Sequence, residues 1–254
     1  MPKFAANITY LFKEMPFLER FDAAAQAGFD AVEVLFPYDD PVTELVRRIN
    51  TAGTPIVLMC TPPPNWTGGV RGFAAIPNGE ERFRRDFKRS LRFAERLRPR
   101  HIQILAGNAQ GPEARDTFIR NLTWAANEAP AQKLTIEPMN AEDMPGYFLD
   151  DFELASVVLA KVGAPNLALQ FDLYHAQKIT GNALGAWQTY RHLVGHVQIT
   201  GFPERCEPGK DDLDYPAFFA ELDASGYDGF VGAEYLPKRR TSDGLGWMKG
   251  IVKK

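Results

Sequence analysis

The sequence predicts a single-domain (β/α)8 barrel over residues 1–254, and three observations support this fold class. Eight short apolar runs alternate with longer segments of helical periodicity along the whole chain. The length of 254 residues suits one such barrel, because (β/α)8 domains typically reach about 250 residues. No Gly-x-Gly-x-x-Gly motif follows any apolar run, which disfavours a dinucleotide-binding open sheet.

Each expected element follows from local pattern. The expected strands are short and apolar, and they cover residues 4–8, 31–35, 55–60, 101–105, 133–137, 167–172, 195–199 and 230–235. The expected helices repeat apolar residues at helical spacing over residues 17–27, 42–52, 80–97, 113–128, 151–162, 183–192 and 216–225. Gly28, Gly53 and Gly226 stand between a helix and the next strand, where glycine commonly ends a helix. Residues 61–78 are too rich in proline and glycine for regular structure, so we expect a long loop over the active face.

Composition narrows the class of partner. The net charge of −3 gives no general attraction to nucleic acid or to anionic lipid. A basic cluster at residues 82–100 alternates with acidic and aromatic residues at helical spacing, so we interpret it as the solvated face of a helix. We therefore expect neither nucleic acid nor membrane as a partner.

The two cysteines and the N-terminus indicate the compartment. Cys60 and Cys206 lie far apart and outside any Cys-x-x-Cys pair, which disfavours a disulfide framework and a thiolate metal site. The first residues lack a signal-peptide pattern, and no apolar run approaches the roughly 20 residues that span a bilayer. We expect a cytoplasmic protein.

Polar side chains end four successive strands of the predicted barrel. These residues are Glu137, Asp172, Gln198 and Glu234. Catalytic groups of (β/α)8 barrels lie at the carboxyl ends of the strands, where the βα loops meet. Burying adjacent carboxylates there is costly unless a cation neutralises them. Any one of them could be satisfied by a nearby loop, but the set of four oxygen ligands favours Mg²⁺ or Mn²⁺.

Two of these residues suit proton transfer. Glu137 and Glu234 end strands five and eight, so we expect them to face each other across the barrel mouth. A metal that binds a carbonyl and its neighbouring hydroxyl acidifies the C–H between them, and the enediolate that forms needs a base and an acid. The pair therefore predicts proton transfer between neighbouring carbons.

Other candidates could contact substrate. His175 follows Asp172 on an expected loop, and Arg205 follows strand seven, where its guanidinium could pair with a substrate carboxylate. A surface histidine and a solvent-exposed arginine are the alternatives. Asp143, Glu33 and Asn7 could line the pocket or only balance charge at its rim. For the remaining histidines we favour structural roles, with core hydrogen bonding at His196 and framework positions at His101 and His192.

Several motifs resemble the hydroxypyruvate isomerase family, which includes the 2-oxo-tetronate isomerases and belongs to the xylose-isomerase-like barrels. The motifs are TIEPMN at 135–140 with PGYFL at 145–149, QFDLYHAQ at 170–177 and GHVQI at 195–199. Further matches are FAAN at 4–7, GFDAVE at 28–33, AEY at 233–235 and GLGW at 244–247. The resemblance implies that Glu137 and Glu234 are proton donor and acceptor. It also implies that these two, with Asp172 and Gln198, bind Mg²⁺ or Mn²⁺.

Some positions depart from the family pattern. Glu142 stands where the family carries an arginine before the aspartate, and Cys206 replaces a histidine in the loop after strand seven. These loops are expected to contact substrate, so the substrate stays open.

The expected activity is an aldose–ketose type isomerisation, that is, an intramolecular oxidoreductase reaction. Its substrate would be a small sugar acid or keto acid, with hydroxypyruvate giving tartronate semialdehyde or 2-oxo-tetronate giving its 3-oxo isomer. A ketose 3-epimerase uses the same groups, although that group usually has histidine where this chain has Gln198. A non-catalytic sugar-binding barrel is the alternative of another class. A homo-oligomer is possible, but nothing in the sequence identifies an interface.

Overall fold

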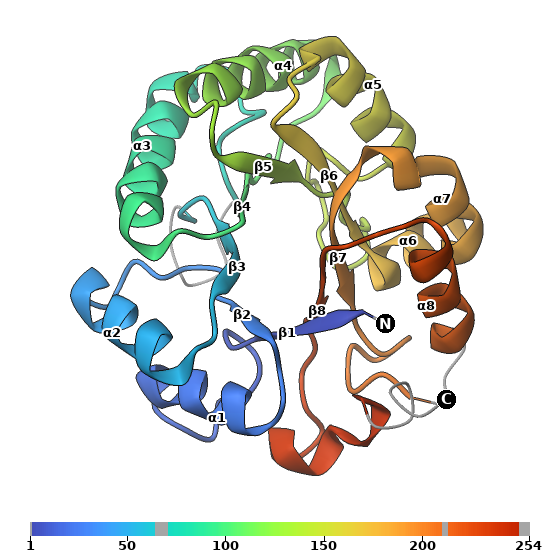
Figure 1. Ribbon diagram of the computed structural model, residues 1–254. Helices are drawn as coiled ribbons and strands as arrows, with labels where there is room; N and C mark the ends of the chain where they lie inside the picture. Colours follow the sequence, from blue (N-terminus) through green and yellow to red (C-terminus); the bar gives the residue numbers. More distant parts are fainter. Residues whose placement is uncertain (1, 64–70, 210–212, 249–254) are drawn as a thin grey trace.

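Eight parallel strands close into a barrel in the order β1 to β8, as predicted (Figure 1). The computed structural model describes residues 2–63, 71–209 and 213–248. The strands are β1 Lys3–Asn7, β2 Ala31–Glu33, β3 Ile56–Cys60, β4 His101–Gln103, β5 Lys133–Ile136, β6 Leu167–Asp172, β7 Val194–Ile199 and β8 Phe230–Ala233. Residues 64–70 of the expected loop over the active face lie outside the described residues.

The helices surround the barrel as an outer ring (Figure 1). They are η1 Phe17–Glu19, α1 Arg20–Gln26, α2 Val42–Ala52, α3 Glu80–Leu97, α4 Gly111–Glu128, α5 Phe152–Val162, α6 Leu173–Thr180, α7 Ala183–Tyr190, η2 Arg191–Leu193, α8 Tyr215–Ala224 and η3 Thr241–Gly244. Gly53 ends α2 with φ 70, a left-handed conformation that glycine adopts without steric cost. The glycine therefore ends the helix at the predicted position.

One helix was not expected from the sequence. We expected a loop after strand six, but α6 begins directly after β6. Asp172 caps it, because its Oδ1 accepts hydrogen bonds from the backbone N–H groups of Tyr174 at 2.7 Å and His175 at 3.3 Å. The expectation of a loop histidine was wrong: His175 lies in the first turn of α6 and is buried. A strand-end carboxylate that also caps a helix gives this immediate transition.

Strand boundaries differ by a residue or more from those expected. β5 ends at Ile136 and β8 at Ala233, so Glu137 and Glu234 are the first residues beyond their strands. Glu234 still continues the ladder, because its N–H donates to the carbonyl of Ile199 at 3.0 Å. Glu234 therefore remains held at the barrel mouth.

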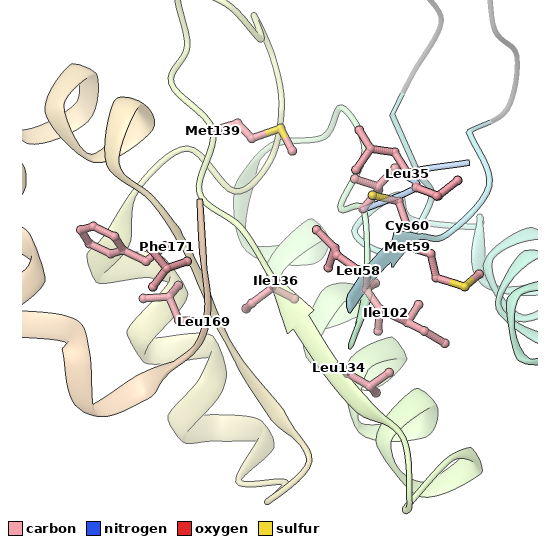
Figure 2. Packing of buried hydrophobic residues seen from close by; sticks show 14 of the residues in the cluster. Leu35, Leu58, Met59, Cys60, Ile102, Leu134, Ile136, Met139, Leu169 and Phe171 are labelled. Atoms are coloured by element: carbon pink, nitrogen blue, oxygen red, sulfur yellow. The ribbon is translucent and has the colours of Figure 1, made fainter. Parts of the chain in front are cut away.

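Apolar and polar side chains alternate along the strands. Ile136 of β5 and Phe171 of β6 lie in the apolar layer between the strands and the helices (Figure 2). Phe171 packs edge-on against Trp187 of α7, with ring centroids 5.4 Å apart. One residue earlier on each strand, Thr135 and Gln170 hydrogen-bond at 3.0 Å inside the barrel. Burying a large apolar side chain contributes about 1.5–3 kcal/mol, so this outer layer stabilises the barrel and leaves the interior to polar groups.

The basic cluster lies on α3. Its arginines are mostly exposed, whereas Phe83, Phe87 and Leu97 are buried against the barrel. The solvated-face interpretation is confirmed. None of the helices in the described ranges is long and apolar enough to cross a membrane.

Candidate active site

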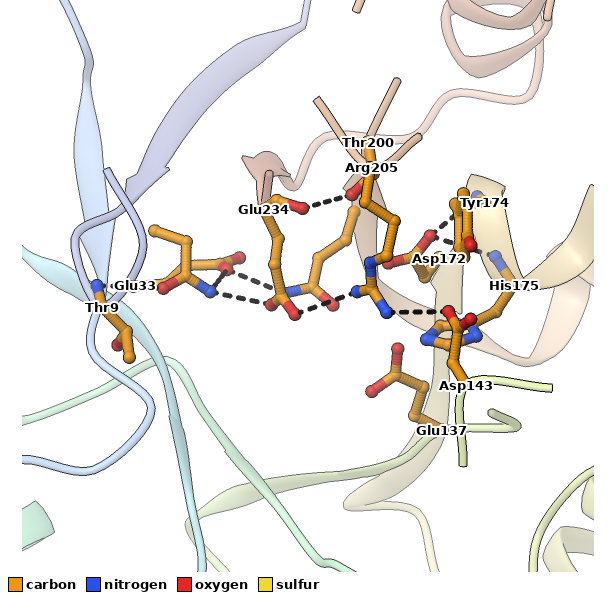
Figure 3. Close-up of polar contacts among 12 residues, drawn as sticks. Thr9, Glu33, Glu137, Asp143, Asp172, Tyr174, His175, Thr200, Arg205 and Glu234 are labelled. Atoms are coloured by element: carbon orange, nitrogen blue, oxygen red, sulfur yellow. Dashed lines mark hydrogen bonds and ion pairs between the residues drawn. The ribbon is translucent and has the colours of Figure 1, made fainter. Parts of the chain in front are cut away.

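A cavity of about 230 Å³ opens at the carboxyl ends of the strands. Its lining consists of Tyr10, Arg71, Glu137, Met139, Asp143, Met144, His175, Arg205, Glu234, Tyr235 and Leu236. Five of the nine residues predicted from the sequence are among them, and Figure 3 shows how they converge. The other four, which are Asp172, Gln198, Glu33 and Asn7, are buried beneath.

Glu137 is a buried carboxylate held by two amides. Gln170 Nε2 donates to Glu137 Oε2 at 3.1 Å, and Gln103 donates to the same oxygen. Burial, followed by the charges of Asp172 and Glu234, raises the pKa of Glu137 well above its ordinary value. Without a cation nearby, Glu137 therefore tends to hold a proton.

The donors around Asp172 fit a divalent cation. Asp172 Oδ1 caps α6, but Asp172 Oδ2 is buried and has no hydrogen-bond partner among the described residues. Ligand atoms of Glu137, Asp172 and His175 all lie within 4.8 Å of one another. A buried unpartnered carboxylate oxygen beside a second carboxylate is costly, and a cation removes both costs.

His175 is better described as a hydrogen-bond donor than as a metal ligand. Its Nδ1 accepts from the backbone N–H of Asn140 at 3.1 Å, and the side-chain nitrogen of Asn140 lies 2.8 Å away. A backbone N–H can only donate, so the proton of the neutral ring belongs on Nε2. Burial lowers the pKa of His175, which keeps the ring neutral. This favours the predicted contact with substrate.

Glu234 lies across the cavity from Glu137 and is held by other donors (Figure 3). Its Oε2 accepts from Asn7 Nδ2 at 2.7 Å and from Gln198 Nε2 at 2.6 Å. Burial and the charge of Glu33 raise the pKa of Glu234 to about 7, against the opposing charge of Arg205. A carboxyl with such a pKa exchanges protons readily near neutral pH.

A buried layer supports Glu234 from below. Glu33 Oε2 accepts from Gln198 at 2.7 Å and from Asn7 at 3.1 Å, and Glu33 Oε1 lies 2.6 Å from His196 Nε2. Burial raises the pKa of Glu33 to about 8 and lowers that of His196 to about 3. Asn7 and Glu33 thus hold Glu234 rather than line the cavity, and the predicted core hydrogen bonding of His196 is confirmed.

Gln198 reaches the site, and the orientation of its amide differs from that of a metal ligand. Its nitrogen points to Glu234 and Glu33, whereas its oxygen accepts from Gln170 Nε2 at 2.7 Å. Turning the amide would present its oxygen to Glu234. That orientation becomes favourable only when a cation lies between the two oxygens, because two acceptors otherwise repel.

Arg205 carries positive charge into the cavity. Its Nη1 lies 3.2 Å from Asp143 Oδ2 and its Nη2 lies 3.7 Å from Glu234 Oε1, while the guanidinium stacks 4.9 Å from the centre of the Tyr174 ring. Burial lowers its pKa, but the charges of Asp172 and Glu234 outweigh this effect and raise the pKa above its usual value. The guanidinium therefore remains charged and able to bind an anion.

Residues 21–251 match the family of xylose isomerase-like TIM barrels. A 2-oxo-tetronate isomerase of Cupriavidus necator is 44% identical over 98% of both chains. A hydroxypyruvate isomerase of Escherichia coli is 37% identical over 98% of both chains. The chain belongs to this family of xylose isomerase-like TIM barrels, together with the 2-oxo-tetronate and hydroxypyruvate isomerases.

Solved structures agree with the fold of the isomerase. A Brucella melitensis protein described as an AP endonuclease of family 2 superposes with a TM-score of 0.95 and 40% identity, over 98% of this chain and 99% of that one. A D-psicose 3-epimerase of Clostridium cellulolyticum has a TM-score of 0.75 at 16% identity, over 97% and 89% of the two chains. The second likeness concerns the fold alone.

Sequence reasoning missed several residues of the candidate site. Gln103 and Gln170 hold Glu137, and each lies on an inward position that the alternation of its strand indicates. Tyr10 and Arg71 also line the cavity, but both come from loops, where no periodicity marks them. Arg71 belongs to the loop at residues 61–78, so this described part of the loop lies at the active face as expected.

Proposed function

We propose that this isomerase interconverts adjacent carbonyl and hydroxyl groups of a small hydroxy-oxo acid. The substrates would be hydroxypyruvate, which gives tartronate semialdehyde, or 2-oxo-tetronate, which gives 3-oxo-tetronate. The observation that carries the proposal is the placement of Glu137, Glu234 and cationic Arg205 around one small cavity. The names of the full-length relatives from Cupriavidus necator and Escherichia coli point to the same two acids.

The cavity favours a compact anion. A volume of about 230 Å³ is below the roughly 300–1,000 Å³ of pockets for drug-sized ligands, so an acid of three or four carbons suits it. Arg205 would pair with the substrate carboxylate, and Asp143 would hold the guanidinium in position. His175 would donate a hydrogen bond to a substrate oxygen. The Brucella melitensis protein is described as an AP endonuclease, a class of enzyme that acts on DNA. The net charge of −3 gives no support for such an activity in this chain.

The two glutamates would move the protons. One takes the proton from the carbon that bears the hydroxyl, and the other gives a proton to the former carbonyl carbon. The hydroxyl proton passes from one substrate oxygen to the other, so atoms and charge balance. In the metal-free site, the raised pKa of both groups allows each to hold a proton near neutral pH. Such acid–base participation typically contributes about 10²–10⁴-fold to the rate.

We further propose that Glu137, Asp172, Gln198 and Glu234 hold Mg²⁺ or Mn²⁺. The unpartnered Asp172 Oδ2 and the neighbouring Glu137 support this placement. When bound, the ion would polarise the substrate carbonyl and stabilise negative charge on its oxygens. The protein side chains would orient the substrate and exchange its protons.

Proton exchange measured by NMR in D₂O tests the proposal. Purified protein with Mn²⁺ is incubated separately with hydroxypyruvate, with 2-oxo-tetronate and with fructose as a ketohexose. We expect deuterium incorporation and an isomerised product from at least one acid. Incorporation into the ketose with inversion at carbon three would instead assign an epimerase, and no exchange with any of the three would overturn the proposed reaction.

Variants of the glutamates test the mechanism. We expect Glu137→Gln and Glu234→Gln each to lower turnover by about 10²-fold or more, because a neutral amide cannot exchange a proton. Glu95→Gln is a matched control, since Glu95 lies on the exposed face of α3, away from the cavity. If Glu137→Gln turned over like the control in metal-loaded, folded protein, the mechanism would fail.

A further inference from the structure

A second cavity of about 650 Å³ opens at the amino-terminal end of the barrel. Its lining includes the first residues of two strands, His101 of β4 and Lys133 of β5, and the turn before β8 around Tyr227. The catalytic groups lie at the opposite ends of the strands, and the two cavities share no lining residue. We call this space the amino-end cavity.

Small residues form part of its wall. Ala168 of β6 and Gly195 of β7 line the cavity where barrels commonly place bulky branched side chains. A Cβ on Gly195 would lie 2.8 Å from the Cβ of Ala168 and 3.6 Å from Nε2 of His101, so this position admits no side chain. The backbone therefore forms the wall between β6 and β7, and His101 stands beside it.

Two buried side chains of the lining carry ring nitrogens without a partner. His101 and Trp187 are 2% and 1% exposed, yet His101 Nδ1 and Trp187 Nε1 find no hydrogen bond among the described residues. Buried polar atoms in native proteins are nearly always satisfied, so each such atom calls for an explanation. The indole N–H can only donate, so a partner for Trp187 must offer a hydrogen-bond acceptor.

The charges around the amino-end cavity are mainly positive. Arg100, Lys133 and Arg191 line it, against the single carboxylate of Asp228. Arg100 lies 3.6 Å from Asp228, and Arg191 lies 3.8 Å from Glu221, which are long separations for ion pairs. Lys133 has no ion-pair partner in the part of the chain that the structure describes. The excess of cationic groups favours an anion at this mouth.

We propose that the amino-end cavity binds a small anion that carries carboxylate or phosphate groups. Its oxygens accept from the indole N–H of Trp187 and pair with Lys133 and Arg191 at the mouth. Both headgroups supply the same chemistry, namely several acceptor oxygens with negative charge. The site is separate from the active site, and the proposal does not depend on the proposed reaction.

Calorimetric titration of the metal-loaded, full-length protein with inorganic phosphate, and separately with malonate, tests the proposal. We expect saturable binding of at least one probe, and the tighter probe identifies the headgroup. Arg205→Ala should leave this binding within twofold, because Arg205 lines only the other cavity. Lys133→Ala/Arg191→Ala should weaken it at least tenfold. Arg84→Ala/Lys88→Ala is the control, since it removes the same charge from the exposed face of α3.

A second variant probes the buried donor without changing charge. Trp187→Phe keeps an aromatic ring in the core but removes the indole N–H, so we expect several-fold weaker binding, while the smaller ring lowers the melting temperature by a few degrees without unfolding the protein. The fluorescence of Trp187 should also change when the probe binds to the wild-type protein. Absence of saturable binding by both probes up to about 10 mM would overturn the proposal. Binding lost in Arg205→Ala but kept in Lys133→Ala/Arg191→Ala would also overturn it, by placing the anion in the active site.

Discussion

Arg205 balances charge at the cavity and is also the group proposed to bind the substrate carboxylate. Its guanidinium lies between Asp143 and Glu234, with Tyr174 beneath it, so its orientation is fixed before any substrate arrives. The backbone at Arg205 has φ 54, a left-handed conformation that is uncommon for a non-glycine residue. Unusual backbone of this kind often occurs at functional sites, which agrees with a recognition role.

Arg205→Lys tests the proposed pairing between the guanidinium and the substrate carboxylate. Lysine keeps the charge but loses the planar two-pronged donor, so we expect KM for the acid substrate to rise about tenfold with a smaller change in kcat. A tenfold change corresponds to about 1.4 kcal/mol of binding. Steady-state kinetics on the variant, with exposed Arg239→Lys as control, measure this. An unchanged KM would mean that the guanidinium does not bind the substrate.

At the scale of elements, Asp172 joins β6 to α6. One carboxylate oxygen caps the helix and the other is left without a partner, so a single residue links local structure to the proposed metal site. The two functions separate chemically, because an amide oxygen can cap a helix but binds a cation more weakly than a carboxylate does.

Replacing Asp172 separates the two functions. Asp172→Asn keeps a capping oxygen and removes a buried carboxylate oxygen that has no partner among the described residues, so metal-free protein should be at least as stable as wild type. Asp172→Ala should be about 1 kcal/mol less stable than Asp172→Asn, because the cap is lost. Urea unfolding in EDTA measures stability, and Mn²⁺ titration should show much weaker binding for both variants. Wild-type Mn²⁺ affinity in Asp172→Asn would exclude Asp172 as a ligand.

Gly232 makes room in β8 for the support layer under Glu234. A Cβ at this position would lie 2.0 Å from Glu33 Oε1, a distance that real contacts do not reach. We expect Gly232→Ala to displace Glu33 and to destabilise the protein by about 1–3 kcal/mol, as overpacking of a core does. Gly246→Ala is the matched control, since a Cβ there meets nothing within 4 Å. Equal unfolding midpoints for the two variants would contradict this account of Gly232.

At the scale of the whole molecule, burial shifts the pKa of carboxyl groups and of histidines in opposite directions. Glu33, Glu137 and Glu234 have a raised pKa, chiefly because of burial, whereas burial lowers the pKa of His101, His175 and His196. Below about pH 6.5 the unfolded chain protonates its histidines, which offsets the protons that the folded glutamates retain. Above about pH 7.5 the unfolded histidines are mostly neutral as well, so up to about pH 8 the glutamates are the main groups whose protonation differs between the two states.

A pH dependence of stability follows for the metal-free protein. The folded state holds protons on Glu33, with a pKa of about 8, and on Glu234, with a pKa of about 7, after the unfolded chain has released them. The free energy of unfolding should therefore fall as pH rises from about 6.5 to about 8, by roughly 2 kcal/mol from Glu33 alone.

Saturating Mn²⁺ should reduce this fall, because metal ligands are already deprotonated, and apparent metal affinity should rise over the same range. Urea unfolding at pH 6.5, 7.2 and 8 in EDTA and in Mn²⁺ measures both effects. A metal-free protein that gains stability across this window would contradict the assigned protonation states.

Local patterns in the sequence predict the barrel and most of the residues of the candidate site. Alternating apolar runs and amphipathic segments are local patterns, and the closed parallel topology brings every strand end to one face. Glu137 and Glu234 could therefore be assigned to one cavity before their neighbours were known.

The remaining features depend on contacts between residues far apart in the chain. Three features of the site join residues from different strands or loops. They are the orientation of the Gln198 amide, the support of Glu234 by Asn7 and Glu33, and the pairing of Arg205. The start of α6 was missed because Asp172 serves as strand end and helix cap together. The amino-end cavity could not be foreseen, because its volume is the space left by side chains of separate elements, and no single segment encodes that space.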